Sequence, residues 1–323
     1  MGRIQNTFLA VLAVLWFSGC ADSKPEVAAE VREIPLELSV QRFDRDFDKM
    51  GPSQLPALKQ MYPYLFPEQV PDSIWQAKHR DTLQIEIRAQ VDSVFADFGP
   101  YQADLELFFK HVKYYFPQAP VPKVVTLTSD VDYQNRVILA DSLLLLGLDN
   151  YLGPGHRFYG NMDRYIAAEL RPDYLTSDVA SAFAGKVIPP PRDRSFVAQM
   201  VYHGKKLYLK DLMMPLAADS VKIRYSADQM QWAKDNEGQI WRYFVERELL
   251  YSTDRELGPR FLDPAPFSKF RLVLDNESPG RLGRYIGWQI VRAYAAQHEG
   301  TLQTLLEMPG EELFKASNYK PPK

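Results

Sequence analysis

Apolar residues recur at helical spacing over much of the chain. Residues 104–116, 195–214, 226–252 and 284–298 carry apolar side chains three and four positions apart, which predicts four long helices. The last of these ranges is apolar almost all round, which indicates a buried helix with Trp288 in the core. Most of the polypeptide is therefore expected to be helical.

Individual residues sharpen the predicted helix ends. Ser195 and Ser226 stand directly before helical patterns, where a serine hydroxyl can cap the first turn. Gly204 lies inside the second helix, where a glycine costs about 1 kcal/mol relative to alanine. These positions predict where two helices begin and mark one weak point within them.

Short runs of β-branched and aliphatic residues predict a small sheet near the middle of the chain. Residues 124–129 indicate one strand, and residues 136–148 indicate two short strands joined through Ala140 and Asp141. Residues 270–275 are expected to be a further strand or extended segment. The predicted fold class is α+β, mostly helical with a small central sheet.

The N-terminus has the pattern of an exported lipoprotein. An unbroken apolar run at 8–17 is shorter than the roughly 18 residues that span a bilayer, so it indicates a signal peptide over 1–19. The sequence "FSGC" places Cys20 where a bacterial lipobox has its acylated cysteine, although Phe17 stands where leucine is usual. We expect lipid attachment at Cys20, an anchored tether over 20–33, and one globular domain over 34–323, with any split into two lobes near 120–150.

Composition and charge narrow the partners. Hydrophobic residues make up 46% of the chain, enough for a sizeable core, and the formal net charge is only −3. Basic residues are not interleaved with aromatic ones as in nucleic-acid-binding proteins, so no nucleic-acid partner is expected. Cys20 is the only cysteine, which excludes an intramolecular disulfide.

The sequence "QMVYH" at 199–203 raises the question of a metal site. Its position in a helix and its spacing match H-E-x-x-H, in which two histidines bind zinc and the glutamate activates a metal-bound water. Here Gln199 is a poor zinc ligand and Met200 accepts no proton, so only His203 remains. We expect no metal, no cofactor and no catalysis at this position, and an ordinary packed helix is the simplest interpretation.

A second polar cluster interrupts the predicted helix at 226–252. Glu237 is a candidate third metal ligand, a candidate buried acid paired with Arg242 or Lys205, or part of an exposed helical turn beside Asn236. The sequence leaves these alternatives open.

A third cluster, "LDNESPGR", brings Glu277 close to Arg281 in the chain. These charges line a cleft or belong to a solvated turn formed around Pro279 and Gly280. Together the three clusters give the candidate cleft residues Gln199, His203, Asn236, Glu237, Glu277 and Arg281.

Several long segments carry a family resemblance. They are "QRFDRDF", "FYGNMDRYIAAEL", "MVYHGKKLYLKDLMMP", "WAKDNEGQIWRYFVERELLYSTD", "RFLDPAPFSKF" and "DNESPGRLGRYIGWQIVRAY". In this order, and together with the lipobox, they resemble the gliding motility-associated lipoprotein family GldB of the Bacteroidetes. That family is similar in turn to predicted zinc peptidases with H-E-x-x-H. The resemblance implies a zincin-like scaffold whose metal site is degenerate at Gln199 and Met200, with Glu237 near the place of the third ligand.

The resemblance also implies a function. It suggests a membrane-anchored, non-catalytic part of the envelope machinery for gliding, linked to type IX secretion, that faces the periplasm and contacts other envelope proteins. The sequence after Cys20 gives no clear sorting signal between the inner and outer membrane. Two alternatives stay open. One is a metallohydrolase that uses His203 and Glu237. The other is a periplasmic cell-wall or peptide-binding protein with an aromatic cleft around Tyr202, Trp241 and Trp288.

Overall fold

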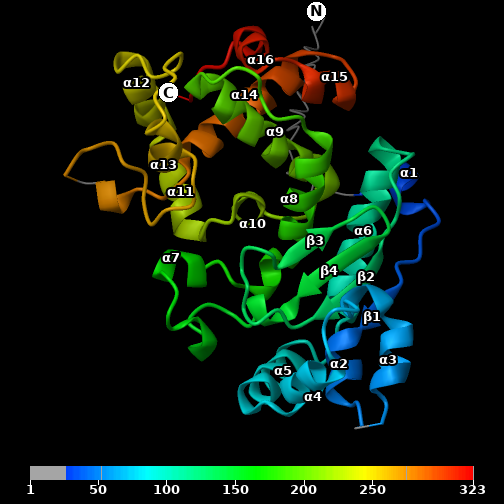
Figure 1. Cartoon of the computed structure of the whole chain (residues 1–323). Coiled ribbons are helices and arrows are strands. Elements are labelled where there is room, and N and C mark those ends of the chain that lie inside the picture. The colour runs from blue at the N-terminus through cyan, green and yellow to red at the C-terminus, as the bar shows by residue number, and fades with distance from the viewer. Residues whose placement is uncertain (1–26, 52, 274, 323) are drawn as a thin grey trace, which may run out of the picture.

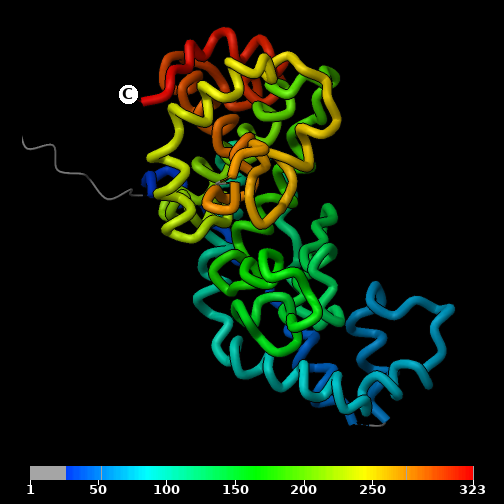
Figure 2. Tube along the Cα trace, turned by 90° about the vertical axis from the view of Figure 1, so that its left-hand side faces the viewer, coloured from blue at the N-terminus to red at the C-terminus, as the bar shows by residue number. Residues whose placement is uncertain are grey.

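A small sheet and a larger body of helices make up the fold (Figure 1). The computed structural model describes residues 27–51, 53–273 and 275–322, so the predicted signal peptide and Cys20 lie outside the described residues. Figure 2 shows the helices from α9 onward at one end and α3 and α4 projecting at the other. The prediction of a mostly helical α+β fold is confirmed, whereas the zincin-like scaffold and the division into domains stay predictions.

The sheet has four strands in the order β1-β2-β4-β3. Strands β1 (Val40–Arg42), β2 (Lys123–Leu127) and β4 (Leu143–Gly147) are parallel, and β3 (Val137–Leu139) runs antiparallel to β4. The β3–β4 turn is closed by a hydrogen bond from Ala140 N to Leu143 O of 2.8 Å, which confirms the predicted pair of short strands.

Each face of the sheet packs on a different hydrophobic cluster, because neighbouring side chains of a strand point to opposite faces. Val124, Leu144 and Leu146 belong to the main core, which extends from Leu38 to Tyr319. Val125 and its neighbours belong to a smaller cluster with the aromatic residues of the N-terminal helices. The helices around the sheet and below it are α2 (Phe43–Asp48), α3 (Leu55–Met61), α4 (Asp72–Arg80), α5 (Thr82–Val94), α6 (Gly99–Tyr115), α7 (Arg164–Ala167) and α8 (Leu175–Val187).

Helices α9 (Phe196–Met213) and α14 (Leu282–Gln297) form the centre of the helical body, and they touch backbone to backbone. A Cβ atom on Gly204 would lie 2.1 Å from Gly287 O, and one on Gly287 would lie 1.9 Å from Met200 O. Only glycine allows this approach, which explains the glycine inside a predicted helix. The remaining helices around this pair are α10 (Asp219–Ile223), α13 (Leu257–Phe261), α15 (Leu302–Glu307) and α16 (Gly310–Ser317).

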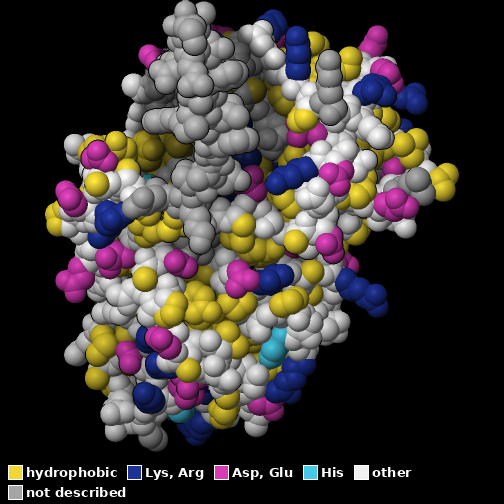
Figure 3. Space-filling model, turned by 180° about the vertical axis from the view of Figure 1, so that it is seen from behind, with side chains coloured by type: hydrophobic (Ala, Val, Ile, Leu, Met, Phe, Trp, Pro, Cys, Tyr) yellow, Lys and Arg dark blue, Asp and Glu magenta, His cyan; other side chains and the backbone are white. Residues whose placement is uncertain are grey.

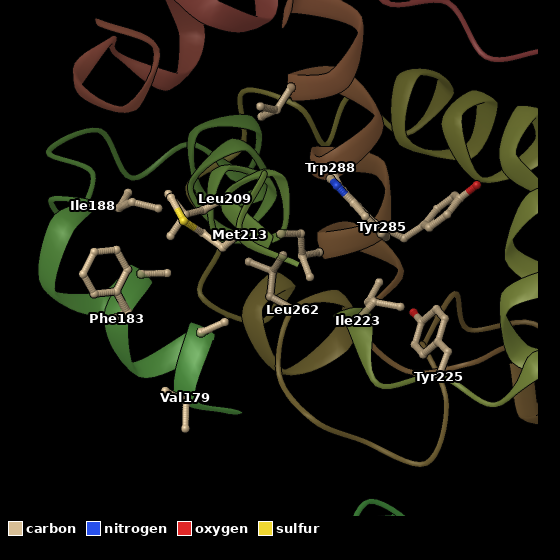
Figure 4. Packing of buried hydrophobic residues seen from close by; sticks show 14 of the residues in the cluster. Val179, Phe183, Ile188, Leu209, Met213, Ile223, Tyr225, Leu262, Tyr285 and Trp288 are labelled. Carbon is tan, nitrogen blue, oxygen red and sulfur yellow. The ribbon is translucent and has the colours of Figure 1, made fainter. Parts of the chain in front are cut away.

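Trp288 lies in this core with 0% of its surface exposed, as predicted. Figure 4 shows it with Tyr285 on α14, while Leu209 and Met213 on α9 lie close to Phe183 and Ile188 at the α8 end of the cluster. On the surface opposite to the side seen in Figure 1, acidic and basic side chains are interspersed among apolar ones (Figure 3).

Two sequence predictions about local structure are wrong in part. The helix predicted at 226–252 is two helices, α11 (Ala227–Asp235) and α12 (Glu237–Glu246), although Ser226 does cap the first as expected. Asn236 separates them, since it leaves helical geometry at the end of α11. The described residues of 270–275 form no strand, because the Asp275 carboxylate accepts hydrogen bonds from the backbone N–H groups of Arg271 and Leu272 and closes a turn.

The last part of the predicted tether is helical. Residues Ala29–Arg32 form a short helix, α1, that contacts α6 and buries Val31. The carbonyl of Arg32 accepts a hydrogen bond from Lys110 Nζ at 3.3 Å. The segment has no aromatic residue, so its composition suggested a linker, but one buried valine is enough to dock it.

Candidate functional site

The first turns of α9 present Gln199 and His203 to a cleft. Ser195 caps the helix, as predicted, by accepting a hydrogen bond from Ala198 N at 3.3 Å. The backbone N–H groups of Phe196 and Val197 donate to the carbonyls of residues 252 and 250, which fastens the segment after α12 against the helix start. The cleft between them has a volume of about 570 Å³.

Gln199 and His203 share this cleft because residues four apart lie on one helical face. Its other lining residues are Arg194, Phe196, Ser252, Thr253, Asp254, Arg255, Leu257, Gly258, Leu262 and Asp263. Phe196 and Leu257 are buried and provide an apolar floor, while the charged residues on the rim carry both signs. A cleft of this size and mixed character can hold a peptide segment or a small polar ligand.

His203 is a neutral imidazole in this setting. Burial lowers the pKa of its side chain to about 2, and the positive charges of Arg284 and Lys206 add to the effect. Within the described part of the chain, no residue hydrogen-bonds the ring, which contacts Tyr202 edge to face at 5.3 Å. The same two cations disfavour a divalent metal ion at this imidazole, since like charges repel.

Position 200 does not contribute to the cleft. Met200 is fully buried in the core, against the backbone of Gly287 on α14. Gln199 donates from Nε2 to Asp193 O at 3.3 Å, which ties it to the loop before the helix. Gln199, in the place of the first zinc ligand, is thus an amide bound to a loop. Met200, in the place of the general base, is a thioether in the core.

Glu237 lies elsewhere, which corrects the expectation that it approaches His203. It is buried at the start of α12, where Tyr285 Oη donates to Oε2 at 2.6 Å and Tyr319 Oη donates to Oε1 at 2.8 Å. Lys205 does not pair with it either, because its Nζ donates to the carbonyls of Leu306 and Met308. Glu237 is a structural acid that holds the C-terminal segment on α12 and α14.

The remaining candidates separate into two places. Asn236 and Glu277 line a second pocket of about 400 Å³, between α11, α12 and the loop at 270–278. Arg281 lines neither this pocket nor the first cleft. It is buried at the start of α14, where Nη2 donates to Glu169 Oε1 at 2.5 Å and to Arg224 O at 3.0 Å.

The predicted aromatic cleft does not form. Trp288 is in the core, and its Nε1 donates to Asp211 Oδ2 at 2.8 Å. Trp241 packs edge to face against Tyr319 at 5.2 Å. Tyr202 is half-buried, with Lys206 Nζ 4.2 Å from the centre of its ring.

A buried ionic network was not predicted from the sequence. Asp178 binds Arg136 Nε at 2.6 Å and Arg224 Nη1 at 3.2 Å, and Arg224 also pairs with Glu169, the partner of Arg281. The two arginines hold the pKa of Asp178 at about 2, against the opposing effect of burial. These partners are far apart in the sequence, so no local pattern points to them.

Metal-binding groups and membrane-spanning helices are both absent from the described residues. No group of three or more His, Cys, Asp or Glu side chains there is placed to hold a metal ion. Within the same residues, no helix is both long enough and apolar enough to cross a membrane.

Comparison with known proteins gives one match. No curated protein and no solved structure matches the chain. The family described as "Gliding motility protein GldB" matches residues 24–321, which covers nearly all of the structure described above. The chain therefore belongs to the GldB family of gliding motility-associated lipoproteins.

Proposed function

We propose that this protein is a membrane-anchored, non-catalytic component of the gliding machinery linked to type IX secretion, and that the cleft beside His203 binds a segment of another envelope protein. The family match over residues 24–321 is the observation that carries the proposal. It covers the cleft, both large helices and the sheet, so the family relationship applies to the whole globular part.

The non-catalytic half of the proposal follows from the chemistry of the cleft. Gln199 presents an amide and His203 a neutral ring, while Met200 is directed into the core. One imidazole beside the cations Arg284 and Lys206 neither retains a zinc ion nor activates water. The mixed charges and apolar floor suit recognition of a polypeptide segment.

The membrane anchor is the lipid on Cys20. Stable anchoring takes more than one acyl chain, and a multiply acylated cysteine provides this. Since α1 begins at Ala29, nine positions after Cys20, and docks on α6, the segment between the lipid and the globular part is short.

Complementation of a deletion strain tests the proposal in an organism whose parent strain spreads on surfaces. We expect loss of spreading and secretion without the gene, and no rescue by the Cys20→Ser variant. The double variant Gln199→Ala/His203→Ala is expected to rescue poorly, because it removes the polar groups of the cleft. Its matched control is Gln231→Ala/His298→Ala, which changes the same residue types at exposed positions outside the cleft. A deletion strain that spreads and secretes normally would refute the role.

Elemental analysis of purified protein tests the non-catalytic half separately. We expect no stoichiometric zinc. Near-stoichiometric zinc that disappears in the His203→Ala variant would establish the metallohydrolase alternative in its place.

A further inference from the structure

A separate pocket of about 320 Å³ lies where α6, the start of α8 and the turn after α9 meet. Its lining residues are Tyr101, Asp104, Leu107, Phe108, Pro172, Asp173, Thr176, Met213, Met214, Pro215, Leu216, Ala217 and Val221. It shares no residue with the cleft beside His203. The sequence does not predict this pocket, because its walls come from three segments that are far apart in the chain.

The walls of the pocket are apolar and adaptable. Tyr101, Asp104 and Phe108 lie on one face of α6, since they are three and four positions apart. Met213, fully buried, and Met214 form the opposite wall. Methionine side chains adjust to different partners, and Leu216, 54% exposed, extends this apolar surface to solvent.

Two carboxylates provide the charge of the pocket. Asp104 is exposed at the edge of the pocket and forms no ion pair or hydrogen bond with any residue in the described part of the chain. Asp173 pairs with Arg171 Nη2 at 3.0 Å. Both acids also raise the pKa of Tyr101, after the larger effect of its burial, so both lie near its hydroxyl. Among the residues named as its lining, none is a lysine, arginine or histidine.

We propose that this pocket binds a lysine or arginine side chain of a partner polypeptide. The aliphatic stem of such a side chain packs on Met214 and Leu216 while its cationic head reaches Asp104. A purely apolar side chain would cover the Asp104 carboxylate without pairing it, and an acidic one would add repulsion. The arrangement therefore selects a cation on an apolar stem.

Calorimetric titration with short peptides tests the inference on the purified protein. The probes are Ac-Ala-Leu-Lys-Leu-Ala-NH₂ and the same peptide with norleucine, which keeps the stem and removes the charge. We expect the lysine peptide to bind about threefold more tightly than the norleucine peptide, as for an exposed ion pair. Higher salt should narrow this difference.

Two variants on one helix locate the effect. Asp104→Asn keeps the shape of the pocket and removes its unpaired charge, so it should weaken binding of the lysine peptide about threefold and leave binding of the norleucine peptide unchanged. Glu106→Gln removes a charge from the same helix outside the pocket, where Glu106 pairs only weakly with Lys110 at 3.8 Å, and should leave both affinities unchanged. Equal binding of the two peptides, equal effects of the two variants, or no binding of the lysine peptide would each overturn the proposal.

Discussion

The two halves of α9 differ in the contacts that their polar side chains make. Near its start, the His203 ring has no hydrogen-bond partner in the described part of the chain and faces a cleft. Near its end, Lys210 Nζ donates to Ser177 Oγ and Lys222 O, both at 2.8 Å, and Asp211 binds Trp288, Arg292 and Lys222. The first half leaves the His203 ring available for recognition, and the second half uses Lys210 and Asp211 to hold the fold together. Substitutions in the two halves should therefore differ in their effect on stability.

The largest effect is expected at the aromatic partner of the second half. Trp288→Ala should lower the free energy of unfolding by about 3–5 kcal/mol, because it removes a fully buried indole and leaves a cavity. Denaturant titration measures the change. Tyr251→Ala, at a ring that is 53% exposed, is the control and should have little effect. Equal loss in the two variants would mean that α14 is wrongly placed.

Asp211→Asn tests the charged part of the same half. The Asp211 carboxylate accepts hydrogen bonds from Trp288 Nε1, Arg292 and Lys222. After the substitution, Arg292 and Lys222 keep only Asp219 as an acidic partner. We expect a loss of about 2–3 kcal/mol in thermal or denaturant unfolding, as for hydrogen bonds to charged groups. Asp141→Asn, which breaks an exposed pair with Lys186, should change stability little. If both variants unfold alike, the network around Asp211 does not stabilise the fold.

Lys210 gives the second half a pH signature. Burial lowers its pKa to about 7, well below the ordinary value of 10.5, although Asp178 acts in the opposite direction. The unfolded chain therefore binds more protons than the folded one between about pH 7 and 10, and stability should rise with pH in this window. Comparing wild type with Lys210→Met isolates this slope from other titrating groups. Parallel stability curves for the two proteins would show that Lys210 is charged in the fold.

The smallest effect on stability is expected in the first half, at His203. His203→Gln should change the free energy of unfolding at neutral pH by less than about 1 kcal/mol, because no described residue hydrogen-bonds the ring. Because the pKa of His203 is lower in the folded chain, protonation below pH 6.5 increasingly stabilises the unfolded chain relative to the folded one. The variant lacks this imidazole and should therefore be more resistant to acid than wild type. Imidazole NMR signals should show no titration of His203 between pH 5 and 8. A midpoint near 6.5 would place the ring in solvent.

The sequence predicted local features better than long-range ones. Ser195 and Ser226 cap helices where expected, since a cap depends on the next three residues. The strand predicted at 270–275 fails because Asp275 closes a turn there, a side-chain effect that outweighs the β-prone composition.

The candidate site shows the same division. Gln199 and His203 share a cleft because helical spacing alone brings them together. Glu237 and Arg281 were expected nearby, but their positions depend on Tyr319 and Glu169, which lie far away in the chain. The pocket at Asp104 was missed for the same reason. Contacts between distant segments carry no local sequence signal.

The glycine contact between α9 and α14 has a mechanical consequence. Gly204 and Gly287 leave no layer of side chains between the two helices that could yield under load. At the beginning of α14, Arg281 is bound to Glu169, which also pairs with Arg224. A force applied at the cleft is thus transmitted directly from α9 to α14 at this contact.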